Sequence, residues 1–175
     1  MATGDKAVAD LAISIDRDVF LRNLLRELSG TLEEVVGLDE AAGFVSIVGQ
    51  HIGEWMDVEY RKAMGAEQLD LQQVTDVLVD LKKRIEGGFY IESMDSEKIV
   101  MGNTRCPFGD KVLQRPSLCM MTSNVFGTVS AENLGYARVC LDRTIANGDG
   151  ECKVTIYLRQ NSSAETDNGR EYFKS

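Results

Sequence analysis

The chain has 175 residues and a formal net charge of −9, and its 43% hydrophobic and 27% charged residues are typical of a globular domain. Because an acidic chain without a basic run repels polyphosphate, we expect no direct nucleic-acid binding. The first residues lack the basic and apolar regions of a secretory signal, and no apolar run reaches the length of a membrane span. We therefore expect a cytoplasmic protein that does not contact a membrane.

Two long amphipathic helices are expected first. Residues 1–15 are weakly patterned and are predicted to be a flexible N-terminus. From Asp16 or Asp18, either of which can cap a helix, apolar residues recur at three- and four-residue steps as far as Gly37. A second helix follows from Asp39, with a wide apolar face.

Three glycines inside the second helix, at positions 43, 49 and 53, each cost about 1 kcal/mol against alanine. Close approach of another helix, such as a dimer seam, would explain them, and so would three tolerated glycines in a well-packed helix. Because the apolar faces of the first two helices are wider than one small sheet would cover, we predict a homodimer whose seam includes both helices.

A third helix is predicted between Asp70, as its cap, and Gly87, with a narrow apolar stripe. Its last turn carries the triplet Lys82, Lys83 and Arg84, which suits the helix dipole better than it suits a binding patch. The pattern then changes to the alternation of a short hairpin, over residues 89–101.

The rest of the chain is read as a loop, one more helix and a second hairpin. Pro116 is well placed to start that helix, and a strong turn signal at 147–150 separates two strands at 137–145 and 152–158. Residues 159–175 are polar and are predicted to be a disordered tail. The expected fold is α+β: one domain over 16–158 with N-terminal helices, then a mostly antiparallel sheet with one intervening helix.

All four cysteines lie in this last part, spaced C-x12-C, C-x20-C and C-x11-C. None of these intervals is the short spacing of a zinc knuckle, and buried cysteines are common, so the spacing alone is weak evidence for a metal site. Cys119 falls at a helix N-terminus, which favours a thiolate. Strand alternation puts Cys140 and Cys152 on opposite faces of the sheet, so we predict a site of Cys106, Cys119 and Cys152 without Cys140.

Four soft or aromatic residues near Cys119, namely Phe108, Met120, Met121 and Phe126, are candidates for lining a small-molecule pocket or shielding a cofactor. Such residues on a central helix are more often simply core. No catalytic residue is predicted, because the chain has no nucleophile elbow, Walker loop or dinucleotide fingerprint. We read the only histidine, His51, as a surface or helix-packing residue in preference to a metal ligand.

The last part of the chain contains five characteristic stretches: CPFG at 106–109, RPSLC at 115–119, ENLGYA at 132–137, IANGDGEC at 145–152 and KVTIYL at 153–158. In these stretches it resembles the methanogen output domain and the broader 4-vinyl reductase type of ligand-binding domain. The resemblance implies an α+β domain, dimeric through its N-terminal helices, with a sensory or regulatory role beside kinases or transcription factors.

The cysteine pattern is also similar to that of iron–sulfur-dependent repressors, although this chain has no winged-helix domain in front. That similarity supports a metal or cluster at the three predicted cysteines, either an iron–sulfur cluster or zinc. Three thiolates alone leave one coordination position open, which Asp110, Asp149, Glu151, His51 or a small molecule could fill. The predicted function is a signalling sensor that uses this site, or a small-ligand pocket, to modulate a partner. A thiol- or metal-dependent enzyme and a structural adaptor with buried cysteines are the alternatives.

Overall fold

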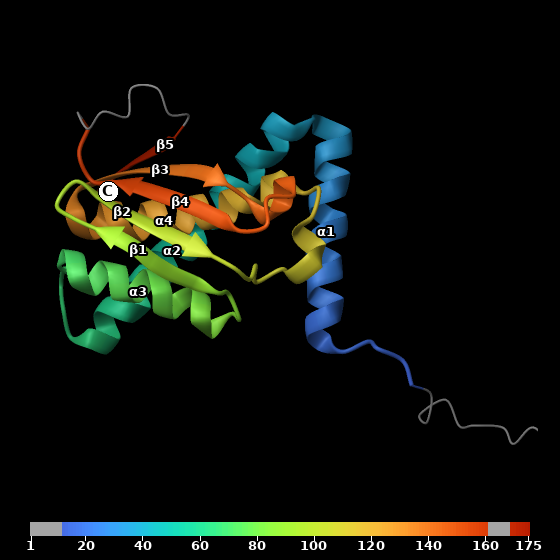
Figure 1. Ribbon diagram of the computed structural model, residues 1–175, viewed down its shortest axis with the longest axis horizontal. Coiled ribbons are helices and arrows are strands. Elements are labelled where there is room, and N and C mark those ends of the chain that lie inside the picture. Colours follow the sequence, from blue (N-terminus) through green and yellow to red (C-terminus); the bar gives the residue numbers. More distant parts are fainter. Residues whose placement is uncertain (1–11, 161–168) are drawn as a thin grey trace, which may run out of the picture.

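The computed structural model describes residues 12–160 and 169–175, which form four α-helices and a five-stranded antiparallel sheet (Figure 1). The helices are α1 (Arg17–Val36), α2 (Leu38–Met64), α3 (Leu71–Arg84) and α4 (Cys119–Leu134). The strands are β1 (Phe89–Met94), β2 (Lys98–Asn103), β3 (Tyr136–Arg143), β4 (Cys152–Tyr157) and β5 (Arg170–Phe173). The α+β prediction, with helices before the sheet and one between its hairpins, is confirmed.

The sheet has the strand order β1-β2-β4-β3-β5, so the two predicted hairpins join along β2 and β4. Asn103, at the end of β2, lies opposite Cys152, at the start of β4. In the second hairpin Leu141 pairs with Val154, and Cys140 pairs with Thr155. Since successive residues of a strand point to opposite faces, Cys140 lies on the other face of β3 from Leu141.

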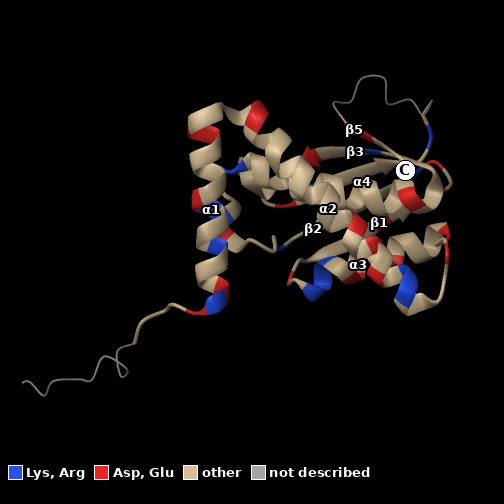
Figure 2. Ribbon diagram, turned by 180° about the vertical axis from the view of Figure 1, so that it is seen from behind, with Lys and Arg blue, Asp and Glu red and all other residues tan. Residues whose placement is uncertain are grey.

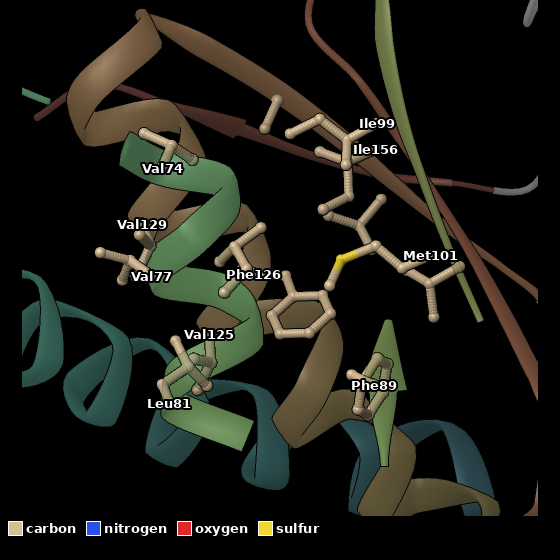
Figure 3. Packing of buried hydrophobic residues seen from close by; sticks show 14 of the residues in the cluster. Val74, Val77, Leu81, Phe89, Ile99, Met101, Val125, Phe126, Val129 and Ile156 are labelled. Atoms are coloured by element: carbon tan, nitrogen blue, oxygen red, sulfur yellow. The ribbon is translucent and has the colours of Figure 1, made fainter. Parts of the chain in front are cut away.

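α4 lies between the sheet and α2, and it is therefore buried all round (Figure 1). This position explains why the apolar residues of α4 do not fall along one stripe and why its polar residues are mostly small and buried. The core between α3, α4 and the sheet centres on Phe126, which is fully buried and contacts Phe89 edge to face, with ring centroids 5.2 Å apart (Figure 3).

Two of the three glycines of α2 face α4 within the same chain. A Cβ atom on Gly53 would lie 2.9 Å from Cβ of Thr128, and one on Gly49 would lie 2.8 Å from Cβ of Asn124. The helix contact inferred from the glycines is therefore the α2–α4 contact, and these two residues do not belong to a dimer seam. Among the described atoms, none lies within 4 Å of a Cβ built on Gly43.

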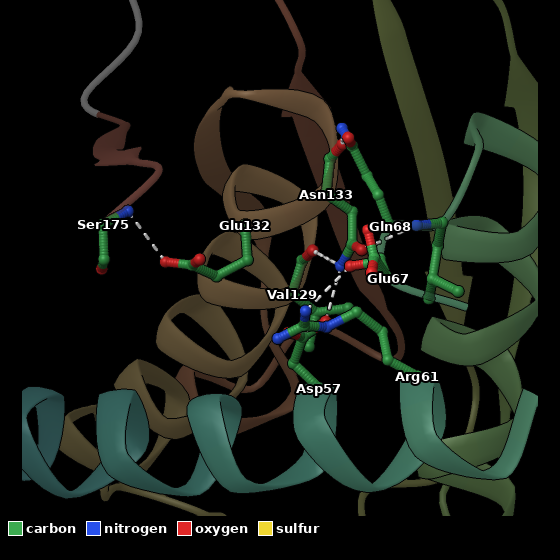
Figure 4. A network of polar contacts seen from close by, with 9 residues as sticks. Asp57, Arg61, Glu67, Gln68, Val129, Glu132, Asn133 and Ser175 are labelled. Carbon is green, nitrogen blue, oxygen red and sulfur yellow. Dashed lines mark hydrogen bonds and ion pairs between the residues drawn. The ribbon is translucent and has the colours of Figure 1, made fainter. Parts of the chain in front are cut away.

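A buried polar network joins α2 and α4 to the start of α3 (Figure 4). The side-chain amide of Asn133 donates to Asp57 at 2.5 Å and to the backbone carbonyl of Val129 at 2.9 Å, and its Oδ1 accepts the N–H of Leu69 at 2.9 Å. Asp57 is also paired with Arg61 at 2.8 Å. Because every one of these buried groups has a partner, the network fixes the two helices against each other.

The prediction of a disordered tail from residue 159 is wrong for residues 170–173, which form β5 against β3. The ring of Tyr172 occupies the space left by Gly127 on α4, and its hydroxyl lies 2.9 Å from that of Ser123. The polar composition of this stretch concealed the strand, because Tyr172 is its only residue that is even half-buried. Residues 161–168, and residues 1–11 of the predicted flexible N-terminus, lie outside the described residues.

The caps of α1 and α3 follow the sequence prediction. Asp16 accepts the N–H of Val19 at 2.8 Å, and Asp70 forms a capping box with Gln73. Figure 2 shows acidic and basic residues interspersed along α1. Within residues 12–160 and 169–175, no helix combines the length and the apolar character needed to cross a membrane.

Candidate functional site: a pocket of three cysteines

Cys106, Cys119 and Cys152 line a single cavity at one end of the sheet. They come from three separate segments: the loop after β2, the first residue of α4 and the first residue of β4. The pairing of Asn103 with Cys152 brings the end of β2 beside the start of β4, and Pro116 begins a short 3-10 helix that leads into α4 at the same end. The structure thus brings together the three cysteines that the sequence analysis grouped.

The cavity is small, with a volume of about 30 Å³, which is close to the space that one water molecule occupies. Apolar side chains such as Phe89, Leu141 and Val154 make up most of its wall. Cys140 lies elsewhere, on the opposite face of β3, where its sulfur is next to Gly169. The described residues contain no disulfide, so the three sulfurs of the pocket are thiols.

The sulfur of Cys152 is held by two N–H donors. The backbone N–H of Ile145 donates to it at 3.4 Å, and the side-chain amide of Asn103 donates at 3.6 Å. Asn103 is buried, and its oxygen accepts the N–H groups of Gly88 and Arg105 at 3.1 and 3.2 Å. Those two bonds fix the amide so that its NH₂ group faces the sulfur. Asn103 therefore orients Cys152, a role that the sequence pattern did not reveal.

The other two thiols are held in their protonated form. Burial raises the pKa of Cys119 to about 12, helped by the neighbouring sulfurs of Cys106 and Cys152 and opposed by a hydrogen bond from Thr144 and by Lys82. Burial likewise raises the pKa of Cys106, against a hydrogen bond from the N–H of Phe108. The expected thiolate at the start of α4 is thus not favoured, because the loss of solvation outweighs the helix dipole.

Lys82 is the residue that the sequence analysis misassigned. It lies in the last turn of α3, as predicted, but it is buried instead of exposed at the helix end. Its ammonium group lies under the pocket, and burial lowers its pKa to about 8 while the sulfurs of Cys106, Cys119 and Cys152 act to raise it. The available signal was its position four residues after Leu78, on the apolar face of α3.

Of the four candidate lining residues, Phe108 lines the cavity. Phe126 is in the main core, where its ring lies 5.1 Å from the Lys82 nitrogen. Met121 packs against the same core, and the carbonyl of Met120 accepts a hydrogen bond from Asn124 within α4. The structure therefore brings one of the four to the three cysteines.

The carboxylates considered as further ligands are engaged elsewhere. Asp149 accepts the N–H of Thr144 at 2.8 Å, and Glu151 is paired with Arg143 at 2.8 Å. Asp110 lies 3.7 Å from the amine of Lys111, and His51 is exposed on α2. The lining of the cavity is therefore supplied with thiols but with no carboxylate or imidazole.

The donor chemistry of the pocket fits a thiophilic metal ion, since three thiols from separate segments face one small, mostly apolar cavity. The arrangement of the thiols in space does not fit a metal ion. Within the described parts of the chain, no three His, Cys, Asp or Glu side chains form a group that could hold one. Ion binding at this pocket would therefore require the thiols to be drawn closer together.

The loop that carries Cys106 is fastened to α1. Arg26 of α1 donates to the carbonyls of Lys111 and Leu113 at 2.7 and 2.8 Å. Glu33, about two turns further along α1, accepts the hydroxyl of Ser117 at 2.5 Å. Because of these hydrogen bonds, a movement of this loop would also move α1.

Comparisons with known proteins identify the fold. The model of the methanogen output domain 1 family matches residues 24–157, which confirms the resemblance to that domain. The phenol-responsive sensory domain of the transcription activator PoxR, solved with phenol, has a TM-score of 0.66 at 14% identity over 82% of this chain and 77% of that one. Trafficking protein particle complex subunit 3 from Naegleria fowleri, solved covalently bound to palmitic acid, has a TM-score of 0.56 at 11% identity over 90% and 99%. No curated protein matches the sequence.

Proposed function

The chain belongs to the methanogen output domain 1 family, and from this premise we propose that it is a cytoplasmic regulatory domain that senses a thiophilic metal ion. The sensing element is the pocket of Cys106, Cys119 and Cys152, and the response is a change in the surface offered to a signalling partner, such as a kinase or a transcription regulator. The sensory role of PoxR, a protein of similar fold, agrees with this assignment.

The convergence of three thiols on one cavity carries the proposal. Three half-buried cysteines from separate segments of the chain share one small cavity, and the fourth cysteine, Cys140, does not join them. A bound ion would hold three thiolates together and leave one coordination position for an exchangeable ligand.

The size of the cavity favours a single ion over a cluster. A volume of about 30 Å³ has room for one ion, whereas a four-iron cluster would require the surrounding loops to move much further apart. We therefore propose zinc or a similar ion, with an iron–sulfur cluster as an outcome that the experiment below can reveal.

The route from the pocket to the surface runs through α1. Drawing Cys106 toward the other two thiols would pull on the loop that Arg26 and Glu33 hold against α1. Because α1 contacts this loop and the neighbouring end of α2, the movement would change how α1 presents its outer face.

That outer face supports a homodimer. Phe20 and Leu28 on α1 are 58% and 54% exposed, and Phe44 and Ile47 on α2 are 52% and 56% exposed. Several exposed large apolar side chains on two neighbouring helices are typical of an interaction surface. We propose that a second copy of the chain covers them. Sedimentation should show a dimer at micromolar concentration that Leu28→Glu converts to a monomer, and a monomeric parent protein would contradict the proposal.

The small-ligand alternative has a different location. A groove between α2 and α3, lined by Trp55, Tyr60 and Ile85 among others, has a volume of about 410 Å³, which is the size of a typical ligand site. The cysteine cavity is too small for such a molecule. An organic ligand would therefore bind away from the thiols, so that its binding would not change on substitution of Cys119.

The test is an anaerobic titration of the reduced protein with Cd²⁺, followed by the sulfur-to-metal charge-transfer absorbance. Serine substitution at Cys106, Cys119 or Cys152 should weaken binding strongly, and Cys140→Ser should bind as the parent protein does. Equal binding by all four variants would refute the proposal. A brown protein after anaerobic purification would replace the single ion with a cluster at the same cysteines.

A further inference from the structure

The groove between α2 and α3 shares no lining residue with the cavity of the three cysteines. Its volume of about 410 Å³ is within the range of sites for small organic molecules. Its floor is apolar, because Leu81 is 2% exposed and Met56 packs against the main core. Trp55 on α2 and Ile85 at the end of α3 line the groove and are 61% and 43% exposed. The groove therefore offers apolar surface on both helices to a molecule of this size.

The guanidinium of Arg84 is held in place at this groove. Its Nε donates to Asp80 at 2.6 Å and to the hydroxyl of Tyr60 at 3.1 Å, and Tyr60 itself donates to Asp80 at 2.6 Å. The guanidinium also lies over the ring of Tyr60, 5.9 Å from its centroid. Among the described residues, none accepts a hydrogen bond from its two Nη groups. Because Arg84 lines the groove, these two donors are available to a carboxylate, which a guanidinium binds through two parallel hydrogen bonds.

Glu59 brings the opposite charge to the same groove. It is an exposed residue of α2, four positions after Trp55, so the two side chains lie on the same side of the helix. None of the ion pairs formed by the described residues includes Glu59. A carboxylate on α2 and a guanidinium on α3 therefore line one apolar groove without being paired with each other.

These charges distinguish between classes of ligand. Arg84, its partner Asp80 and Glu59 carry one positive and two negative charges. An organic anion would be attracted by Arg84 and repelled by Glu59, and a simple amine would experience the reverse. A neutral apolar molecule would partly desolvate both groups and give neither a partner. A zwitterion that carries a carboxylate, an ammonium group and an apolar substituent matches both charges and the apolar floor.

We propose that the groove between α2 and α3 binds an amino acid with a large apolar side chain. The carboxylate of the ligand accepts hydrogen bonds from the two Nη groups of Arg84, its ammonium group lies toward Glu59, and its side chain lies against Trp55 and Leu81. Asp80 and Tyr60 do not contact the ligand; they orient Arg84. This is a second site beyond metal sensing, and it does not depend on the three cysteines.

The experiment uses Trp55, the only tryptophan of the chain, whose fluorescence reports directly on the groove. The reduced, metal-free protein is titrated with L-phenylalanine and excited where tryptophan absorbs and phenylalanine does not. Two analogues of the same shape separate the two charges of the ligand. Phenylpropionate keeps the carboxylate and lacks the ammonium group, whereas phenethylamine keeps the ammonium group and lacks the carboxylate.

We expect the parent protein to bind L-phenylalanine more tightly than either analogue. Glu59→Gln should weaken the binding of phenylalanine and phenethylamine by about 2- to 5-fold, as for an exposed ion pair, and should not weaken that of phenylpropionate. Arg84→Gln should weaken the binding of phenylalanine and phenylpropionate by about 5- to 10-fold and spare phenethylamine. Lys83→Gln is the matched control, because it removes the same charge from the neighbouring exposed residue, which does not line the groove. It should bind all three ligands as the parent does.

Equal binding of all three ligands by the parent protein and by both groove variants would show that the groove recognises only an apolar ring, and would overturn the proposal. Absence of phenylalanine binding, by fluorescence and by equilibrium dialysis, would overturn it as well. Trp55 fluorescence that changes with protein concentration, and not with ligand, would show that a second copy of the chain covers the groove instead. Each of these results leaves the three-cysteine site untouched, because the titration contains no metal.

Discussion

Replacing Gly53 by alanine tests the close packing of α2 against α4. The added Cβ would lie 2.9 Å from Cβ of Thr128 and 3.2 Å from Cα of Val125, and the second of these atoms is backbone that cannot rotate away. Overpacking of this kind costs about 1–3 kcal/mol. The gain in helix propensity from glycine to alanine is about 1 kcal/mol, so the variant should be destabilised by about 0–2 kcal/mol.

Gly43→Ala is the matched control, since it makes the same change in the same helix. Among the described atoms, none lies within 4 Å of the new Cβ, so the variant should be stabilised by up to about 1 kcal/mol. Because the propensity gain is common to both variants, the difference between their unfolding free energies measures the overpacking directly. Urea denaturation gives both values. Equal stabilisation of the two variants would refute a close α2–α4 contact at Gly53.

Two further predictions concern the C-terminus and the buried lysine. Deleting residues 161–175 should destabilise the fold by at least about 1.5–3 kcal/mol, because the ring of Tyr172 leaves its place on α4; an unchanged melting temperature would contradict the role of β5. Burial lowers the pKa of Lys82 to about 8, so a protonated Lys82 opposes folding below that pH, and the penalty disappears as the pH rises above the unfolded value of about 10.4. In urea denaturation, Lys82→Met should therefore have a higher unfolding free energy than the parent at pH 7, and the difference should shrink by pH 10.5. The facing thiols of Cys106, Cys119 and Cys152 are common to both proteins. An advantage that grew with pH would contradict the burial of a charged Lys82.

The positions of the cysteines within their elements were predictable because they depend on local signals, whereas the pairing of β2 with β4 that brings them together is a long-range contact. Strand alternation separates Cys140 from Leu141, and the turn before Cys152 fixes where β4 begins. The short helix started by Pro116 places Cys119 at the first residue of α4. Each of these steps is set by residues close together in the sequence.

The features that were missed depend on contacts between distant parts of the chain. Lys82 belongs to a basic triplet that suits a helix end, and only the sheet packed over α3 shows that it is buried. β5 has four residues, and it is defined by its pairing with β3 and by Gly127, more than thirty positions earlier. The glycines of α2 signalled a close helix correctly, but the sequence did not say that the helix was α4 of the same chain.

The central claim, that Cys106, Cys119 and Cys152 form one metal site, is tested most directly by counting sulfur ligands. X-ray absorption of the protein loaded with one equivalent of zinc gives the number of sulfur atoms at about 2.3 Å from the ion. We predict three sulfur ligands in the parent protein and in Cys140→Ser, and two in each of the variants at positions 106, 119 and 152. A count that does not change on substitution of these three cysteines, or that falls in Cys140→Ser, would contradict the account.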